Sequence, residues 1–384
     1  MGATTHVADE AALRAGVREV CAGFPGAYWR GLEPDRYPEA FVAAMTAAGL
    51  LAVLIPTEYG GSGLGLEQAA VILEEVNAAG GSASACHAQM YTMGTLLRHG
   101  TEAQKRRWLP AIAAGEIRLQ AFGVTERDAG SDTTRIATRA ERRGDGWVID
   151  GHKAWTSRAL HSDLMLLLAR TAPFDPAHRA DGLSVFLIDL RDLPGVTIRA
   201  TEAMVNHATS EVFLDGVDVP ADTLVGEEGR GFRHILDGMN AERILIAAEC
   251  VGNGRWFIDR ATDRARDREV FGRPIGQNQG VQFPLARAHV RIEAADLMRF
   301  RAAELFDRGE PCGAEANMAL LLAADAAWEA ANATVQTFGG YAFDAEYDVE
   351  RKFRETRLFQ VAPISTNLIL SYVSEHVLGL PRSF

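Results

Sequence analysis

The chain has 384 residues, of which 47% are hydrophobic and 23% charged, and its formal net charge is −12 at pH 7. This composition indicates a folded protein, and the length predicts two or three domains. The negative charge argues against a general binder of nucleic acids or of anionic membranes. The four cysteines are widely spaced, which predicts neither a disulfide framework nor a metal site. Because there is neither a signal-peptide pattern nor an apolar run of about 18 residues, we expect a cytoplasmic protein.

Residues 1–120 are predicted to form an N-terminal helical domain. Three segments repeat apolar residues with the period of an α-helix: 40–50, 66–77 and 85–100. Gly49 is a stop signal near the end of the first segment, and Thr101 followed by Gln104 predicts the start of a further helix. The proline and the glycines of residues 55–63 predict a loop.

Residues 121–228 differ in pattern and are predicted to form a middle β domain. Short apolar segments of strand length are expected at 136–140, 147–149, 164–169, 184–190 and 210–214. Asp145-Gly146 and Asp150-Gly151 have the composition of hairpin turns. Closely spaced strands of this kind are typical of a small antiparallel barrel or a sandwich, and we expect the barrel. No strand is followed by Gly-x-Gly-x-x-Gly, so a Rossmann dinucleotide site is not expected.

Residues 229–384 are predicted to form a C-terminal four-helix bundle. Long amphipathic segments are expected to be helical at 232–266, at 279–308, at 315–338 and from Pro363 to Val377. The predicted fold is therefore mostly α with a central β domain. It consists of an N-terminal helical domain, a small antiparallel β-barrel and a C-terminal four-helix bundle.

Two polar blocks of the middle domain, residues 122–132 and 151–157, are candidates for a binding site. In the first block, Gly130 lacks a Cβ and lets the backbone approach a ligand, and Ser131 adds a hydroxyl. The second block places the broad aromatic face of Trp155 at a strand end. Together the blocks could hold a flat cofactor with polar edges, although either block alone is more typical of an ordinary turn.

The two blocks together resemble signatures of the acyl-CoA dehydrogenase family. Residues 125–132 match Thr-Glu-x-x-x-Gly-Ser-Asp, and residues 153–157 match Lys-x-Trp-(Ile/Thr)-(Ser/Thr). Residues 100–110 resemble the family run Gly-Thr-Glu-x-Gln-Lys-x-x-Trp-Leu-Pro. Residues 268–279 resemble Arg-x-x-Phe-Gly-x-(Pro/x)-Ile…Gln, and residues 336–340 resemble Gln-x-x-Gly-Gly. Several motifs in the right order across nearly the whole chain are far more specific than any one of them.

The resemblance implies a homotetrameric flavoprotein that binds FAD between the β domain and the bundle and passes electrons to an electron-transfer flavoprotein. By motif position, the residues on the flavin side are Phe122, Val124, Thr125, Gly130, Ser131, Trp155 and Ser157. Ser365 and Asn367 replace the family Thr and Gln near the flavin. The adenine and pyrophosphate side, from a neighbouring subunit, comprises Arg268, Phe271, Gln279, Gln336 and Gly340. Without the motif, the favoured explanation of Arg268 is the solvated end of the charged run at residues 263–268.

The resemblance also implies removal of a proton α to a thioester carbonyl and transfer of the β hydrogen to the flavin as hydride. Many family members carry the base in a late Tyr-Glu-Gly-Thr motif, whose Glu position is Pro363 here. A subset carries it as Glu-Arg on the long helix, and this chain has Glu242-Arg243. Helical spacing places Glu242 beside an apolar stripe, where burial makes a carboxylate a stronger base. The alternative is a structural Glu242 bonded to another helix.

The predicted substrate-binding residues are Ser131, Asn240 and Arg243. Pro363 has no N–H, whereas the family backbone at that position donates to the thioester oxygen, so one donor is lost. Three functions follow. The first is an acyl-CoA dehydrogenase with Glu242 as base, acting on an acyl-CoA or acyl-carrier thioester. The second is a relative with altered chemistry, such as flavin-dependent oxygenation or desaturation of a CoA- or carrier-bound biosynthetic substrate. The third is a non-catalytic flavoprotein or an assembly partner, against which the retained Glu242 argues.

Overall fold

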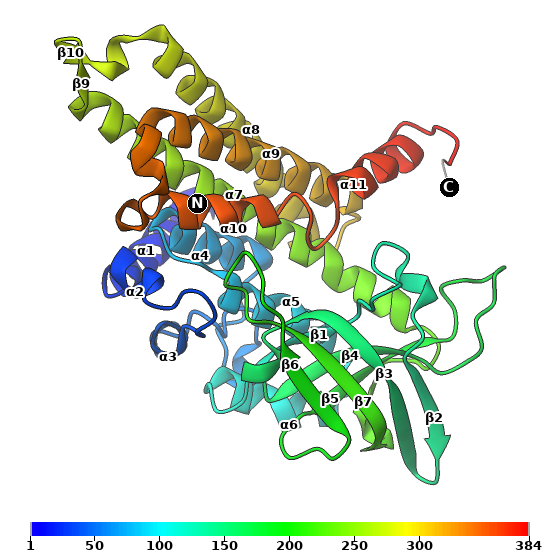
Figure 1. Cartoon of the computed structure of the whole chain (residues 1–384). Helices are drawn as coiled ribbons and strands as arrows, with labels where there is room; N and C mark the ends of the chain where they lie inside the picture. The colour runs from blue at the N-terminus through cyan, green and yellow to red at the C-terminus, as the bar shows by residue number, and fades with distance from the viewer. Residues whose placement is uncertain (1, 383–384) are drawn as a thin grey trace. The chain divides into compact units, whose positions relative to one another are not determined.

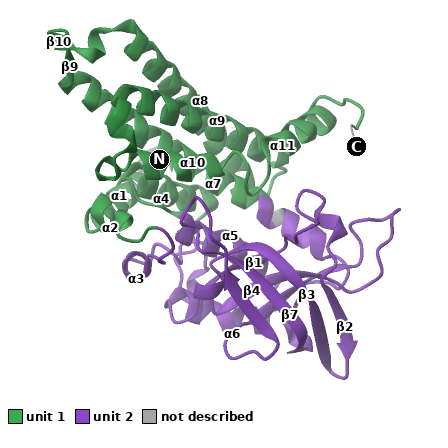
Figure 2. Ribbon diagram, viewed as in Figure 1, with its two compact units in different colours: residues 1–33, 65–83, 240–384 green, residues 34–64, 84–239 purple. Residues whose placement is uncertain are grey.

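The computed structural model describes residues 2–382, with the side chains of residues 10–236 and 238–382. The chain divides into two compact units, each built from separate stretches of sequence (Figure 2). Unit 1 comprises residues 1–33, 65–83 and 240–384, and unit 2 comprises residues 34–64 and 84–239. The long helix α7 (Gly231–Asp267) begins in unit 2 and continues in unit 1.

Unit 1 is helical, and Figure 1 shows its elements in chain order. Besides most of α7, it contains α1 (Gly2–Ala22), α2 (Gly26–Arg30), α4 (Leu66–Ala78), α8 (Gln279–Asp307), α9 (Gly313–Phe338), α10 (Val349–Leu358) and α11 (Thr366–Tyr372). A short hairpin, β9 (Glu269–Val270) with β10 (Arg273–Pro274), connects α7 to α8. The helix α9 packs against α8, α10 and α11, and its buried face is made mostly of alanines, whose small side chains allow close helix contacts.

A buried group of charges joins four helices of unit 1. Glu74 of α4 is almost fully buried and accepts hydrogen bonds from three arginines: Arg14 of α1, Arg255 of α7 and Arg299 of α8. Arg299 is also fully buried and donates to Asp296. Because charges removed from water are tolerated only when they are paired, this network fixes the helices in one arrangement.

Unit 2 combines three helices with an eight-stranded sheet. The helices are α3 (Glu39–Ala47), α5 (Ser84–His99) and α6 (Glu102–Ala113). The strands are β1 (Leu119–Gly123), β2 (Arg139–Arg143), β3 (Gly146–Ser157), β4 (Leu164–Arg170), β5 (Leu183–Asp189), β6 (Val196–Ala200), β7 (Thr209–Pro220) and β8 (Leu224–Val225). Side chains of β4 alternate between two apolar clusters: Leu166 packs with residues of α5 and α6, and Leu167 packs with Phe186 and Trp147 on the other face.

The predicted closed antiparallel barrel is not confirmed. The strand order is β6-β7-β3-β2-β4-β5-β8, and β6 and β8 are edges that do not pair with each other in the described part of the chain. The strand β8 has only two residues and offers too few backbone groups to close the sheet. In addition, β1 and β2 each pair with β4 in parallel, so the sheet is mixed. The central sheet between helical parts is as predicted.

Two local expectations in the sheet were wrong for identifiable reasons. Asp150-Gly151 is not a turn, because β3 runs through it to Ser157. Gly151 is required by a close approach, since a Cβ there would overlap the side chain of Thr138. The expected strand at 136–140 begins only at Arg139, because the N–H groups of Ala137 and Thr138 donate to the Glu126 carboxylate instead of to a neighbouring strand.

The helix predictions hold better than the strand predictions. Thr101 caps α6 as expected, with its Oγ1 accepting from Gln104 N at 3.2 Å and its N–H donating to the Gln104 side chain. The fourth helix of the predicted bundle is wrong in detail: α11 is short, a π-helical turn (Val373–Val377) follows it, and α10 was not predicted. Within the described residues, none of the helices combines the length and apolarity needed to cross a lipid bilayer.

The Glu74 network predicts a large loss of stability when its central carboxylate is removed. Glu74→Ala leaves buried guanidinium groups without their anion and should lower the free energy of unfolding by about 3–5 kcal/mol, measured by urea denaturation. Glu293→Ala is the matched control, because Glu293 is an exposed partner of Arg255, and its loss should cost less than about 1 kcal/mol. Equal effects of the two substitutions would show that burial does not set the strength of this network.

Candidate functional site

The structure brings the two predicted polar blocks of unit 2 together. The chain that leaves β1 runs beside β3: the N–H of Ala154 donates to the carbonyl of Thr125 at 2.9 Å. The ammonium of Lys153 donates to the carbonyl of Val124 at 3.1 Å. These bonds place the start of the first block against the middle of the second, as a shared cofactor surface requires.

A buried ion pair, missed by the sequence analysis, holds this arrangement. Lys153 Nζ lies 2.8 Å from Glu126 Oε1, and the Lys153 side chain is fully buried. Burial lowers the pKa of Lys153 to about 8, although the Glu126 charge opposes this. Burial by itself raises the pKa of Glu126. Lys153 and the hydrogen bonds from Ala137 and Thr138 outweigh burial, so the Glu126 pKa lies below its ordinary value of 4.5. Glu126 and Lys153 both lie within the family motifs quoted above, and their motif positions could have indicated this ion pair from the sequence.

Trp155 is exposed by a distortion of β3. The pairing of β3 with β7 shifts register between Lys153 and Thr156, and Trp155 sits in this bulge with φ of 56°. Such a backbone is unfavourable for a bulky residue, and strained positions of this kind cluster at functional sites. The indole is 65% exposed, so its face is available to a planar ligand. Ser157, two residues further on, is half-buried and pairs with Thr209.

The other predicted flavin-side residues differ in exposure. Phe122 is half-buried and meets the Tyr91 ring edge-on at 5.7 Å between centroids. Gly130 and Ser131 are exposed in the loop after β1. A Cβ on Gly130 would meet no atom within 4 Å, so the described residues give no steric reason for a glycine there.

The predicted base lies inside unit 1 on α7. Glu242 is only 7% exposed, and Arg243 beside it is equally buried. Arg243 Nη1 donates to Asn240 Oδ1 at 3.0 Å, which joins two of the three predicted substrate residues. Burial lowers the pKa of Arg243 below its ordinary value, while the neighbouring Glu242 charge opposes that change. The structure therefore places a carboxylate, a guanidinium and an amide together on one part of the helix.

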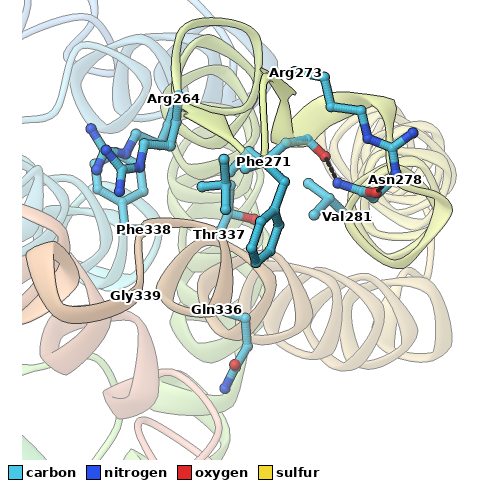
Figure 3. A pocket seen from close by; sticks show the side chains of 12 residues that line it. Arg264, Phe271, Arg273, Asn278, Val281, Gln336, Thr337, Phe338 and Gly339 are labelled. Atoms are coloured by element: carbon cyan, nitrogen blue, oxygen red, sulfur yellow. Dashed lines mark hydrogen bonds between the residues drawn. The ribbon is translucent and has the colours of Figure 1, made fainter.

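A second site lies in unit 1 where α7 ends. A cavity of about 450 Å³ is lined by Arg264, Arg268, Val270, Phe271, Arg273, Ile275, Asn278, Val281, Gln336, Thr337, Phe338 and Gly339. These residues come from the end of α7, the β9–β10 hairpin, the start of α8 and the end of α9. Figure 3 shows Arg264 against Phe338 on one side and Arg273 with Asn278 on the other. Three lining residues are arginines and none is acidic, so the cavity is suited to an anion.

Three of the residues predicted for the adenine and pyrophosphate side line this cavity: Arg268, Phe271 and Gln336. Gln279 and Gly340 are not among the lining residues, although Asn278 and Gly339, their immediate neighbours, are. Phe271 is fully exposed and has φ of 55°, in the hairpin turn that also contains Gly272. Arg264 lies in the charged run at residues 263–268 and was not predicted as a site residue.

The late segment that replaces the usual family base lies between α10 and α11. Pro363 is half-buried there and offers no N–H. Ser365 is the N-cap of α11, and its Oγ accepts from the N–H of Leu368 at 3.4 Å. Asn367 is exposed in the first turn of α11. The Ser365 hydroxyl therefore has a local structural role in this chain.

Comparison with known proteins gives consistent matches along the chain. Residues 8–116, 121–217 and 229–377 match the N-terminal, middle and C-terminal domains of acyl-CoA dehydrogenase, respectively. The acyl-CoA dehydrogenase fadE12 of Mycobacterium bovis is 38% identical over 341 residues, which cover 88% of this chain and 87% of the relative.

Two solved structures have the same fold. A glutaryl-coenzyme A dehydrogenase in complex with glutaryl-CoA superposes with a TM-score of 0.90 at 31% identity, over 98% of this chain and 96% of that chain. The FAD complex of PigA superposes with a TM-score of 0.90 at 26% identity, over 97% of this chain and 98% of that chain.

The Glu126–Lys153 pair predicts a specific pH dependence of stability. The Glu126 pKa is lower in the folded protein than in the unfolded chain. As the pH falls toward and below about 4.5, the unfolded chain therefore binds more protons at this residue than the folded protein does. The stability that Glu126 contributes is thus complete above that pH and is lost on acidification. Glu126→Gln should lower the free energy of unfolding near neutral pH, and the deficit should shrink toward pH 3. A deficit that stays constant with pH would contradict this ion pair.

Proposed function

Because the chain belongs to the acyl-CoA dehydrogenase family and is an oxidoreductase acting on CH–CH bonds, we propose that it binds FAD and dehydrogenates an acyl thioester. The bond oxidised lies between the α and β carbons of the acyl group, and Glu242 is the base. The single observation that carries this proposal is the burial of Glu242 beside Arg243 on α7, in a chain whose late family base is replaced by Pro363.

The residues of the two binding regions fit FAD. The cavity in unit 1 offers arginines for a pyrophosphate and apolar side chains for an adenine ring. In unit 2 the exposed Trp155 offers a flat face, and Thr125, Ser131 and Ser157 of the two polar blocks offer short hydrogen-bonding groups. Ser365 and Asn367 are proposed to complete the flavin side. When bound, FAD supplies the acceptor for the hydride that leaves the β carbon.

Glu242 is proposed to take the proton from the α carbon of the thioester. An aspartate or glutamate that serves as a carbon base works best where water is excluded, because desolvation favours its protonated form. Its burial in unit 1 meets this requirement. Arg243 and Asn240, which are hydrogen-bonded to each other, are proposed to orient the thioester carrier together with Ser131. Pro363 supplies no N–H to the thioester oxygen, so that oxygen must find its donors elsewhere.

The length of α7 supports a site shared between two copies of the chain. Glu242 and Asp267 are 25 positions apart on this helix, which at about 1.5 Å per residue corresponds to roughly 38 Å. An extended FAD molecule is shorter than this distance. A flavin beside Glu242 therefore cannot place its adenine in the cavity of the same chain, and Arg268, Phe271, Gln279, Gln336 and Gly340 are proposed to serve a neighbouring subunit.

The outer face of α8 supports assembly. Phe283, Val290 and Leu297 follow one another at intervals of seven residues, so they lie on one side of the helix, and all three are largely exposed. An apolar row of this kind is typical of a helix that packs against another subunit. We propose a homotetramer in the cytoplasm that passes electrons to an electron-transfer flavoprotein.

Pro363 favours one alternative, a relative that oxygenates or desaturates a CoA- or carrier-bound biosynthetic substrate. A site with fewer donors to the thioester oxygen stabilises an enolate less, which slows simple dehydrogenation. Two assays distinguish these functions. Turnover with a dye acceptor under anaerobic conditions supports dehydrogenation, whereas oxygen consumption coupled to product formation supports the oxygenating relative.

The base assignment predicts that Glu242→Gln strongly slows flavin reduction by substrate. Anaerobic mixing of the FAD-loaded protein with a panel of acyl-CoA thioesters should bleach the flavin, and the substitution should slow bleaching by about a hundredfold or more. Glutamine has nearly the shape of glutamate but cannot accept the proton. Stopped-flow absorbance of the flavin measures the rate.

Glu249→Gln is the matched control for this experiment. Glu249 is buried on the same helix seven positions further on, and it has no proposed role in catalysis. This variant should bleach at nearly the wild-type rate. If Glu242→Gln bleaches as fast as wild type while its flavin content is normal, Glu242 is not the base.

A shared site predicts complementation between two inactive chains. Glu242→Gln retains the cavity, and Arg268→Met retains the base, so each variant alone should be inactive. A hybrid assembled from both, with different purification tags, contains one intact site in each pair and should regain about half of the wild-type turnover. A hybrid as inactive as its parents would place the base and the cavity in the same chain's site.

A further inference from the structure

We propose that Arg264 is a second pyrophosphate-binding residue of the unit 1 cavity, acting with Arg268 on the two phosphates of the nucleotide. This inference rests on the proposed binding of FAD and assigns a residue to it. Arg264 is not part of the motifs that indicate a flavoprotein. The evidence for Arg264 is its position in the lining of the cavity.

The placement of Arg264 is the first argument. It precedes Arg268 by four positions at the end of α7, so both side chains leave the same face of the helix, and both line the cavity. The N–H of Arg268 donates to the carbonyl of Arg264 at 2.9 Å, which continues the helical pattern through both residues. Two like charges at this spacing repel each other. No acidic residue lines the cavity to offset the repulsion, whereas a diphosphate would.

The support beneath the Arg264 guanidinium is the second argument. Its central carbon lies 4.8 Å from the centre of the Tyr341 ring and 5.6 Å from that of Phe338. Aromatic faces attract a cation and fix its orientation. The Nε atom is buried and has no hydrogen-bond partner within the described part of the chain. The guanidinium is therefore oriented in advance while part of its hydrogen-bonding capacity is unused.

The neighbouring arginines show what distinguishes Arg264. Arg266 lies two positions further on, is not among the residues that line the cavity, is 73% exposed and pairs with Asp263 at 3.5 Å. Arg273 lines the cavity, but its Nη2 donates to Asn278 Oδ1 at 2.8 Å. Among the described residues, neither Arg264 nor Arg268 pairs with a carboxylate or a side-chain amide, so these two arginines remain for an anion.

The helix dipoles at this cavity favour a second cation beside a bound anion. The carboxyl ends of α7 and α9 both lie at this cavity, because its lining includes Arg264 at the end of one helix and Gln336 to Gly339 at the end of the other. The carboxyl end of a helix carries a partial negative charge, which disfavours a bound phosphate. Two guanidiniums offset that charge and offer planar pairs of N–H donors to separate phosphate groups.

The test compares nucleotide affinities of Arg264→Met, Arg264→Lys and the control Arg266→Met. Isothermal titration of the flavin-free protein with FAD, ADP and AMP gives the dissociation constants, and thermal denaturation without ligand confirms that each variant is folded. Arg264→Met should weaken FAD and ADP by about 10- to 100-fold and AMP by much less, because AMP lacks the second phosphate. Arg264→Lys should fall between, since it keeps the charge but loses the planar fork. Arg266→Met should match wild type.

The outcomes separate this inference from the FAD proposal. If Arg264→Met binds FAD and ADP as tightly as wild type, or weakens AMP as much as ADP, Arg264 only packs on the aromatic rings and offsets the helix dipoles. If the wild-type protein binds ADP but not FAD, the proposed flavin function fails. The ADP affinities of the four proteins then still decide whether Arg264 contacts the second phosphate.

Discussion

The length of α7 is the constraint on which the proposed site depends. One helix carries the buried Glu242 in its first half and ends at an arginine-lined cavity roughly 38 Å further on. An α-helix of this length is a rigid rod, so the two regions cannot approach each other within one chain. If both regions serve one FAD molecule, catalysis requires that subunits assemble. The exposed apolar row along α8 is then explained as a surface that packs against another subunit.

Buried ion pairs give each unit its fixed geometry. In unit 2, the Lys153–Glu126 ion pair joins the two polar blocks, and the bulge beside Lys153 leaves Trp155 exposed. In unit 1, Glu74 collects arginines from three helices. Burying such charges costs solvation energy, and that cost is offset only when every partner is in position. The main effect of these ion pairs is therefore to select one arrangement of the helices and strands, and their net contribution to stability is the smaller effect.

The limits of the sequence analysis have physical causes in particular residues. The resemblance to the acyl-CoA dehydrogenases and the assignment as an enzyme are confirmed, because several motifs identify them jointly. Gly151 was misread as a turn because a glycine in a turn and a glycine under a side chain have the same local sequence. Arg264 was missed because its two aromatic supports, Phe338 and Tyr341, lie more than seventy positions away in the sequence.

The sequence by itself determined the helical segments, the caps such as Thr101, the order of helical, sheet and helical parts, and the family. These features depend on residues that are close in the chain or on motifs read along it. Only the tertiary structure decided that the sheet stays open, that Lys153 is buried against Glu126, and that a cavity forms where α7, α8 and α9 meet. Each of these depends on contacts between distant segments, whose geometry local patterns do not encode.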